Sequence, residues 1–304
     1  MREEAFRLAE KDMTEKTLEA YNDVFADIVN VLLFKGKKLI NEEDLVTESP
    51  HSIYKANGRL HEQERDVAKY WLNGTIRIAL MGFENQTEAD ADMSLRVLSY
   101  DGAAYRAQLL TDKNSEDSNV RYPVVTLVLY FGYKHRWNKA KSLLERISIP
   151  ESLKPFVNDY RINIFEVAWL DDEVVSKFQS DFRLVADYFV QMRKNKQYEP
   201  PEETIKHVHE FLQLMSVMTG DSRYEDVYRT SGKELNNMCK VLDAVESKGL
   251  EQGILQGITQ GKDAERISSI RNVMSSLKVS AMRAMEILCI PDNERKKYLA
   301  LIEG

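Results

Sequence analysis

The sequence predicts an α/β protein in which helices flank a mixed β-sheet. Two apolar runs rich in β-branched and aromatic residues, 122–132 and 161–170, are typical of strands that are buried on both faces. The dipeptide Asn73-Gly74 separates two further β-compatible segments, and both of its residues tolerate the positive φ of a tight hairpin turn. Helical segments alternate with these strands, which is the pattern of a sheet covered by helices.

The hydrophobic pattern predicts the elements in order along the chain. Apolar residues at helical spacing predict a first helix over residues 18–34. Residues 37–58 are polar and predict a loop or a short helix. The Asn73-Gly74 turn predicts that residues 66–71 and 75–86 pair as antiparallel strands. The remaining predicted helices cover residues 94–110, with an alternative break near Asp101-Gly102, and residues 139–147, 173–194 and 202–218.

The composition is that of a globular chain and excludes several classes of protein. The 304 residues suffice for one large domain or two of ordinary size, and 43% of them are hydrophobic. A formal net charge of -7 excludes a histone-like coat of nucleic acid but leaves room for a local basic groove. No apolar stretch reaches about 18 residues and the start lacks an apolar core, so we expect neither a membrane span nor a signal peptide. Two cysteines, Cys239 and Cys289, show neither a disulfide framework nor metal-binding spacing, which favours the cytoplasm.

The pattern divides the chain into an α/β domain over residues 1–215 and a helical region over residues 216–304. Four glycines recur every four residues in the second region, at Gly249, Gly253, Gly257 and Gly261. Each glycine inside a helix costs about 0.8–1 kcal/mol relative to alanine, so a helix here is weak unless it is packed. Two alternatives follow: a flexible or partly helical connector, or a segment that pairs helices and forms a homo-oligomer. Short helices with a turn at Pro291-Asp292 are predicted after it.

A pair of acids marks the predicted hairpin as a candidate active site. Side chains at positions i and i+2 of a strand share a face, so Glu84 and Gln86 project together. If the hairpin forms, Asp66 on the neighbouring strand reaches the same place. Two carboxylates together with waters and phosphate oxygens suit Mg²⁺. A bound Mg²⁺ activates water and neutralises charge that develops on a phosphate.

This Asp…Glu-x-Gln pattern resembles the PD-(D/E)xK nuclease superfamily, with glutamine in place of the usual lysine. It is most similar to the recombination-promoting nuclease family, whose members are also described as transposases and commonly carry Glu-x-Gln. The flanking sequence carries the same likeness over residues 15–215: an opening helix at residues 22–33, the strand ending in residues 84–87, and an Arg/Tyr helix with Arg96, Tyr100 and Tyr105.

The resemblance implies a bacterial, metal-dependent DNA endonuclease linked to recombination or mobile elements. Asp66 and Glu84 would hold Mg²⁺, with Mn²⁺ as a substitute, and Gln86 would position water or substrate. Asp23 on the first helix would supply a further acid, although an ordinary solvated helix acid is the alternative. Arg96 and Tyr100 would contact the DNA backbone; their alternatives are a structural salt bridge for Arg96 and packing for Tyr100.

The sequence departs from the superfamily pattern in two places. Arg65 stands where the superfamily has a proline, and Gln86 cannot supply the positive charge of a lysine. A rival interpretation is therefore a protein that keeps the nuclease fold as a DNA-binding or assembly module without efficient catalysis. Among the basic clusters, Lys134 and Arg136 lie just past a predicted strand end, so they are the preferred candidates for backbone contact.

Overall fold

The computed structural model describes residues 18–303 except 49–50, 57–58, 65, 75, 112–120 and 232–235. Arg65, the residue before the candidate acid Asp66, therefore lies outside the described residues. The chain forms two compact units, Met1–Leu242 and Asp243–Gly304. None of the described helices combines the length and apolar character needed to cross a bilayer.

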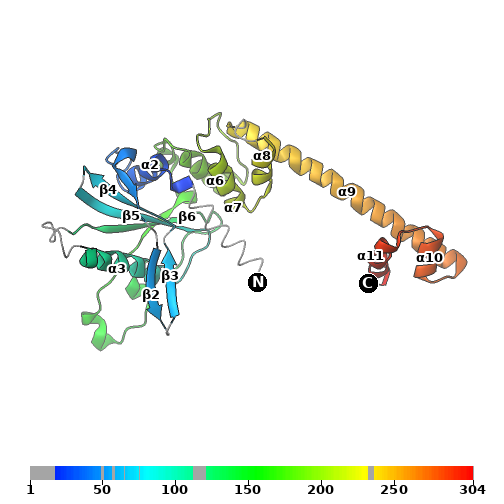
Figure 1. The fold of residues 1–304 in the computed structure, drawn as a ribbon, viewed down its shortest axis with the longest axis horizontal. Helices are drawn as coiled ribbons and strands as arrows, with labels where there is room; N and C mark the ends of the chain where they lie inside the picture. Colours follow the sequence, from blue (N-terminus) through cyan, green and yellow to red (C-terminus); the bar gives the residue numbers. More distant parts are fainter. Residues whose placement is uncertain are drawn as a thin grey trace. The chain divides into compact units, whose positions relative to one another are not determined.

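A five-stranded mixed sheet forms the centre of the first unit (Figure 1). The strands β1, β4 and β5 are antiparallel, whereas β5, β6 and β7 are parallel, which confirms the predicted α/β fold with a mixed sheet. Asn73 pairs with Ile76 across the predicted turn, and Gly74 adopts a φ of +60° that glycine tolerates. In spatial order the strands are β1 (Leu45–Thr47), β4 (Val67–Asn73), β5 (Ile76–Gln86), β6 (Val124–Tyr130) and β7 (Asn163–Glu166).

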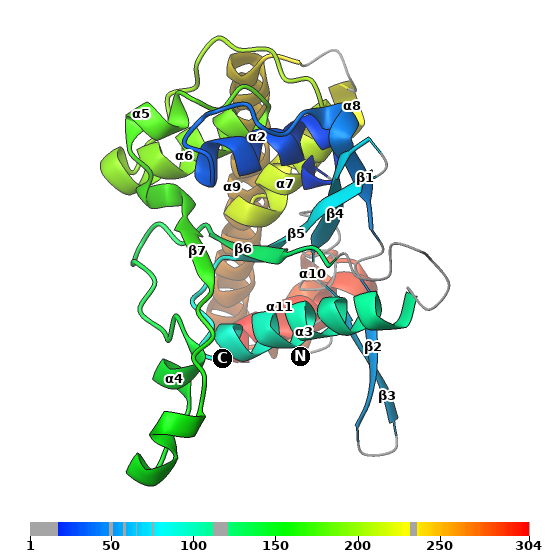
Figure 2. The ribbon, with the colours of Figure 1, turned by 90° about the vertical axis from the view of Figure 1, so that its left-hand side faces the viewer.

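Helices cover both faces of the sheet (Figure 2). On one face lie α2 (Asn22–Leu32) and α6 (Phe182–Asn195): the Phe25 ring stacks on Phe83 with centroids 4.3 Å apart, and Phe131 meets Phe182. On the other face α3 (Met93–Thr111) packs Met93 and Val97 against β6. Because successive strand residues point to opposite faces, Glu84 faces α3 while Phe83 faces α2.

Two regions differ from the predicted elements. Residues 37–58, expected as a loop or short helix, contain the short helix η1 (Glu42–Asp44), the strand β1 and the strand β2 (His51–Ala56), which pairs with β3 (Arg59–Glu64). The predicted helix 173–194 is two helices, α5 (Asp172–Val175) and α6. The chain turns between them because Asp27 accepts hydrogen bonds from the backbone N–H groups of Gln179 and Ser180.

The other elements of the first unit are helices. The helix α3 runs unbroken through Asp101-Gly102, so the alternative break there is absent. The helix α7 (Val208–Thr219) spans the boundary expected at residue 215 and buries Leu214 and Met215 in this unit. The remaining helices are α4 (Leu143–Arg146), η2 (Glu151–Phe156), η3 (Val167–Trp169) and α8 (Arg223–Ser231).

The second unit is helical, as predicted. Its long helix α9 (Met238–Leu277) begins in the first unit and contains all four of the regularly spaced glycines. The turn at Pro291-Asp292 separates α10 (Ala281–Ile287) from α11 (Asp292–Glu303). Both short helices pack on the end of α9 through a small core that includes Ile270, Met285 and Tyr298.

Candidate active site

The structure brings Asp66 and Glu84 together. Asp66 lies one residue before Val67, which pairs with Phe83, and its backbone N–H donates to the Phe83 carbonyl over 3.2 Å. The Asp66 carboxylate accepts the backbone N–H of Asn85 over 2.5 Å. Only 1% of Glu84 is exposed. Both acids therefore lie on the face covered by α3, as the hairpin pattern predicted.

Two residues of α3 complete this cluster. Arg96 and Tyr100 lie one helical turn apart, and Arg96 Nη2 contacts both the Glu84 carboxylate and, over 3.4 Å, the Tyr100 hydroxyl. Arg96 Nη1 also donates to Asp90 over 3.1 Å. Tyr100 is 5% exposed. The predicted site residues Asp66, Glu84, Arg96 and Tyr100 are thus neighbours in space.

The electrostatics of the cluster keep its donors protonated. Burial works to lower the pKa of Arg96, but the negative charge of Glu84 and the hydrogen bonds to Tyr100 and Asp90 outweigh it and raise that pKa. Burial raises the pKa of the Tyr100 phenol, and the charges of Glu84 and Asp66 raise it further against the opposing effect of Arg96. A guanidinium and a neutral phenol are both hydrogen-bond donors, which suits them to anionic oxygens.

Gln86 ends β5 at the carboxyl edge of the parallel strands. It is half-buried, lies opposite Tyr130 of β6, and its carbonyl accepts the N–H of Phe131 over 2.8 Å. The strand alternation places its side chain on the same face as Glu84. The following turn contains Asp92, which pairs with Arg146 over 2.5 Å. Gln86 therefore lies at the end of β5, next to the loops that follow β5 and β6.

A buried acid that the sequence analysis missed lies on the other face of the same strand. Glu19 is fully buried and accepts a hydrogen bond from the Asn85 side-chain amide over 2.9 Å. It precedes α2 by three residues, and the sequence analysis singled out only Asp23 in the predicted first helix. No local signal pointed to Glu19; its contact with Asn85 identifies it. Through Asn85, Glu19 thus supports the strand segment that carries Glu84 and Gln86.

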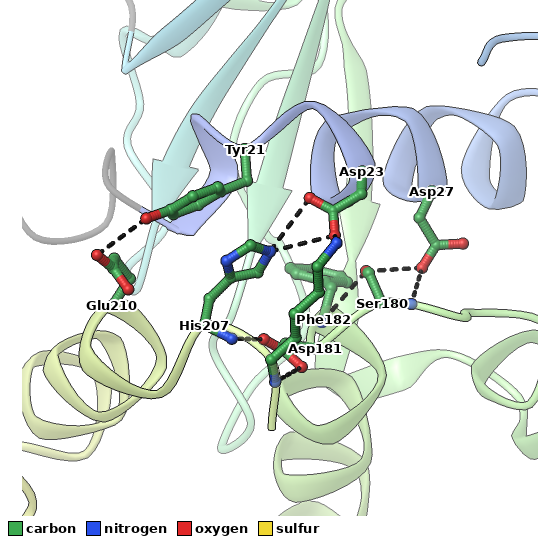
Figure 3. A network of polar contacts seen from close by, with 9 residues as sticks. Tyr21, Asp23, Asp27, Ser180, Asp181, Phe182, His207 and Glu210 are labelled. Carbon is green, nitrogen blue, oxygen red and sulfur yellow. Dashed lines mark hydrogen bonds and ion pairs between the residues drawn. The ribbon is translucent and has the colours of Figure 1, made fainter. Parts of the chain in front are cut away.

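Asp23 belongs to a separate polar network between α2 and the start of α7 (Figure 3). Its carboxylate contacts Lys206 Nζ at 2.6 Å and His207 Nε2 at 3.1 Å. The His207 ring stacks on Tyr21 with centroids 3.7 Å apart, and Asp181 accepts the backbone N–H groups of Lys206 and His207. Partial burial works to raise the pKa of Asp23, but Lys206 and His207 outweigh it and lower that pKa.

This network separates Asp23 from the predicted metal site. Its helix α2 covers the face to which Phe83 points, whereas Asp66 and Glu84 lie on the face covered by α3. Among the described residues, no contact joins Asp23 to either acid. The structure thus places Asp23 away from its expected position beside the metal, because a helix residue follows the sheet face on which its helix packs.

The predicted DNA contacts Lys134 and Arg136 lie in the loop after β6. Both are exposed, and Arg136 pairs with Glu166 at the end of β7 over 3.3 Å. Gln86, Tyr130 and Glu166 are register partners in a row across three parallel strands. The basic loop therefore follows the same edge of the sheet as Gln86.

The cluster offers the kind of oxygen ligands that a hard divalent cation prefers. Asp66 and Glu84 supply carboxylate oxygens, the ligands that Mg²⁺ prefers, and Mg²⁺ needs few protein ligands because it keeps several waters. Where the structure describes the chain, no group of three or more His, Cys, Asp or Glu residues is placed to hold a metal. Arg96 adds a positive charge beside Glu84. The cluster can therefore supply two carboxylates and two donors for an anionic ligand.

Comparison with known proteins identifies a family for the centre of the chain. Residues 78–219 match the family described as "Putative transposase, YhgA-like". The match includes Glu84, Gln86, Arg96 and the strands β6 and β7, and it confirms the resemblance found from the sequence. The description indicates a role related to transposition or recombination. No curated protein and no solved structure matches the chain.

Proposed function

We propose that this protein, whose residues 78–219 match the YhgA-like transposase family, is a metal-dependent DNA endonuclease. The observation that carries the proposal is the pair Asp66, directly before β4, and Glu84 on β5, two acids on one face of the sheet with Arg96 and Tyr100 beside them. Asp66 and Glu84 would hold Mg²⁺ or Mn²⁺. When bound, the metal supplies an activated water and charge neutralisation at a phosphodiester.

The residues of the chain have distinct tasks in this proposal. Gln86, on the same face as Glu84, orients the attacking water through its amide. Arg96 and Tyr100 donate hydrogen bonds to the phosphate oxygens, where charge increases as the bond to the attacking oxygen forms. The proposed site lies in a chain whose two described cysteines are both free, which suits a reducing cytoplasm.

Cleavage of supercoiled plasmid tests the proposal. Purified protein is incubated with Mg²⁺, with Mn²⁺ or with EDTA, and the nicked and linear products are measured. We expect cleavage that needs metal and is lost in Asp66→Asn, while the exposed-acid control Glu43→Gln cleaves as the wild type does. Cleavage that persists in EDTA, or that Asp66→Asn retains in full, would contradict the assignment.

A second function, a nuclease-fold binding or assembly module, is favoured by one contact. Arg96 neutralises Glu84 directly, and Gln86 replaces the lysine of the superfamily pattern. A site in which Glu84 is neutralised and the lysine is replaced would bind DNA without cutting it. Thermal unfolding distinguishes the two functions: an active site gains a higher midpoint in Mg²⁺ or Mn²⁺ that Glu84→Gln loses, whereas a binding module unfolds at the same temperature with metal or with EDTA.

We also propose a homo-oligomer that forms through the C-terminal region. Leu250, Ile254 and Ile258 recur every four residues along α9 and are at least half exposed. Among the residues that the structure describes, no atom outside α9 lies within 4 Å of the positions where Gly253 and Gly257 would carry a Cβ. This apolar, small-residue stripe could pack on a second copy of α9. Light scattering of Ile254→Lys in the full chain should give a smaller species than the wild type; an unchanged mass would contradict the proposal.

A further inference from the structure

Two arginines from distant parts of the chain stack on one tryptophan at the carboxyl edge of the sheet. The guanidinium of Arg136, in the loop after β6, lies 4.7 Å from the Trp169 ring centroid. That of Arg193, on α6, lies 4.9 Å from the same ring. Trp169 itself ends η3 directly after β7, and its indole N–H donates to the Gly132 carbonyl over 3.1 Å. We call Arg136, Trp169 and Arg193 the Trp169 cluster.

The Trp169 cluster carries excess positive charge in an acidic protein. Arg136 pairs with Glu166, but no carboxylate among the described residues pairs with Arg193 or with the neighbouring Lys134. Arg193 uses its Nε–H to donate to the Ala168 carbonyl over 2.7 Å. Stacking on an indole occupies the face of a guanidinium and leaves donors at its edge, the arrangement that recognises a phosphate in a bidentate manner. A local positive charge of this kind attracts anions even on a chain of net charge -7.

The position of the cluster relative to the acids points to its ligand. Gln86, Tyr130 and Glu166 are register partners across β5, β6 and β7, so Glu166 lies two strand spacings, about 10 Å, from Gln86. The arginines at the Glu166 end of this row would therefore bind a phosphate other than the one at the acids.

We propose that the Trp169 cluster is a clamp for a backbone phosphate of the DNA, other than the phosphate at the cleaved bond. The clamp rests on the proposed nuclease function, and it assigns two residues, Trp169 and Arg193, that contact neither acid. Trp169 acts as a positioning residue that holds the two guanidinium planes. Arg136 and Arg193 bind the backbone phosphate and read no base.

Fluorescence anisotropy of a short labelled DNA duplex tests the clamp. The full-length protein is titrated in EDTA, where metal-dependent cleavage cannot occur, over a series of NaCl concentrations. Arg193→Gln and Arg136→Gln should each weaken binding about tenfold and reduce the slope of log affinity against log salt by about one. Trp169→Phe, which keeps an aromatic face, should bind nearly as the wild type does. Lys240→Gln is the matched control, because it removes an exposed positive charge that does not belong to the Trp169 cluster.

The outcomes separate the clamp from the nuclease. Wild-type affinity and salt slope in both arginine variants would overturn the clamp, as would a wild type that binds no DNA at low salt. Plasmid cleavage that survives alongside such a result would leave the nuclease in place. Conversely, reduced binding in the arginine variants of a protein that never cleaves would support the clamp and contradict the nuclease.

Discussion

Two acidic networks lie on opposite faces of the same sheet, and they differ in how their charge is balanced. On the α2 face, Asp23 meets two basic groups, Lys206 and His207. On the α3 face, one guanidinium, that of Arg96, contacts both Glu84 and Asp90. An acid that is paired with its own basic groups links the structural elements that carry them. The α3 face also carries Asp66, whose carboxylate accepts the backbone N–H of Asn85 next to Glu84. This pair of carboxylates is why we propose the metal site on the α3 face.

The largest effect should come from removing an acid on each face in turn. Glu84→Gln should reduce the rate of plasmid cleavage by about a thousandfold, equivalent to about 4 kcal/mol of transition-state stabilisation. Asp23→Asn should keep most of the rate per folded molecule, because its carboxylate contacts α7 rather than the acids. Circular dichroism of both variants controls for folding. Equal losses of cleavage rate in the two variants would show that the acids on the two faces do not differ in function.

Removing the guanidinium of Arg96 should lower the stability of the fold. Removing its partner Glu84 as well should recover part of that loss. Arg96→Gln leaves the buried carboxylate of Glu84 without its guanidinium. We expect a loss of about 2 kcal/mol in the free energy of unfolding, less than for a fully buried pair because Arg96 is partly exposed. Urea unfolding of Arg96→Gln combined with Glu84→Gln should recover much of this loss. Additive losses would show that the two side chains do not interact.

The α2 face also contains a buried lysine whose charge should make stability depend on pH. Lys69 is fully buried and donates to the Ala20 carbonyl, Asn22 and Thr47, and burial lowers its pKa from 10.5 to about 8. Between these values the unfolded chain binds more protons than the folded one, so this group makes the folded state more stable as pH rises, by up to about 1.4 kcal/mol per unit. Urea unfolding at a series of pH values should show a smaller rise in Lys69→Met; an identical pH profile would contradict this explanation.

The smallest effect concerns the ion pairs of Asp23. Because the folded pKa of Asp23 is lowered, its contribution is present above the unfolded value of 3.8 and is lost as pH falls through the folded pKa. Asp23→Asn should therefore reduce stability by about 0.5–1 kcal/mol at neutral pH and by nothing at the acid end of the profile. A double-mutant cycle with Lys206→Gln measures the coupling. If Asp23→Asn is less stable than the wild type by the same amount at the acid end of the pH profile, Asp23 does not act through its charge.

Local pattern accounts for the parts of the fold and site that the sequence predicted. The Asn73-Gly74 turn and strand alternation were enough to place Asp66 beside Glu84 and to align Gln86 with it. The apolar runs were enough to predict β6 and β7. Each of these features depends on neighbours that are close in the sequence or on the two-residue period of a strand.

The features that the sequence did not predict depend on contacts between distant segments. Helical spacing did not single out Glu19, since only the folded structure shows that this residue, which precedes α2, meets Asn85. The break between α5 and α6 comes from Asp27, over 150 residues away. The strands β2 and β3 consist largely of polar residues and show no apolar period. Likewise, no local pattern links Trp169 to its two arginines.

Binding of Mn²⁺ tests the central claim most directly, that Asp66 and Glu84 form a metal site and Asp23 does not. Isothermal titration of the wild type, Glu84→Gln and Asp23→Asn with Mn²⁺ compares the two faces without requiring a DNA substrate. We expect the wild type and Asp23→Asn to bind one ion per chain and Glu84→Gln to lose it. Unchanged binding by Glu84→Gln, or loss of the ion in Asp23→Asn alone, would contradict the assignment of the site to the α3 face.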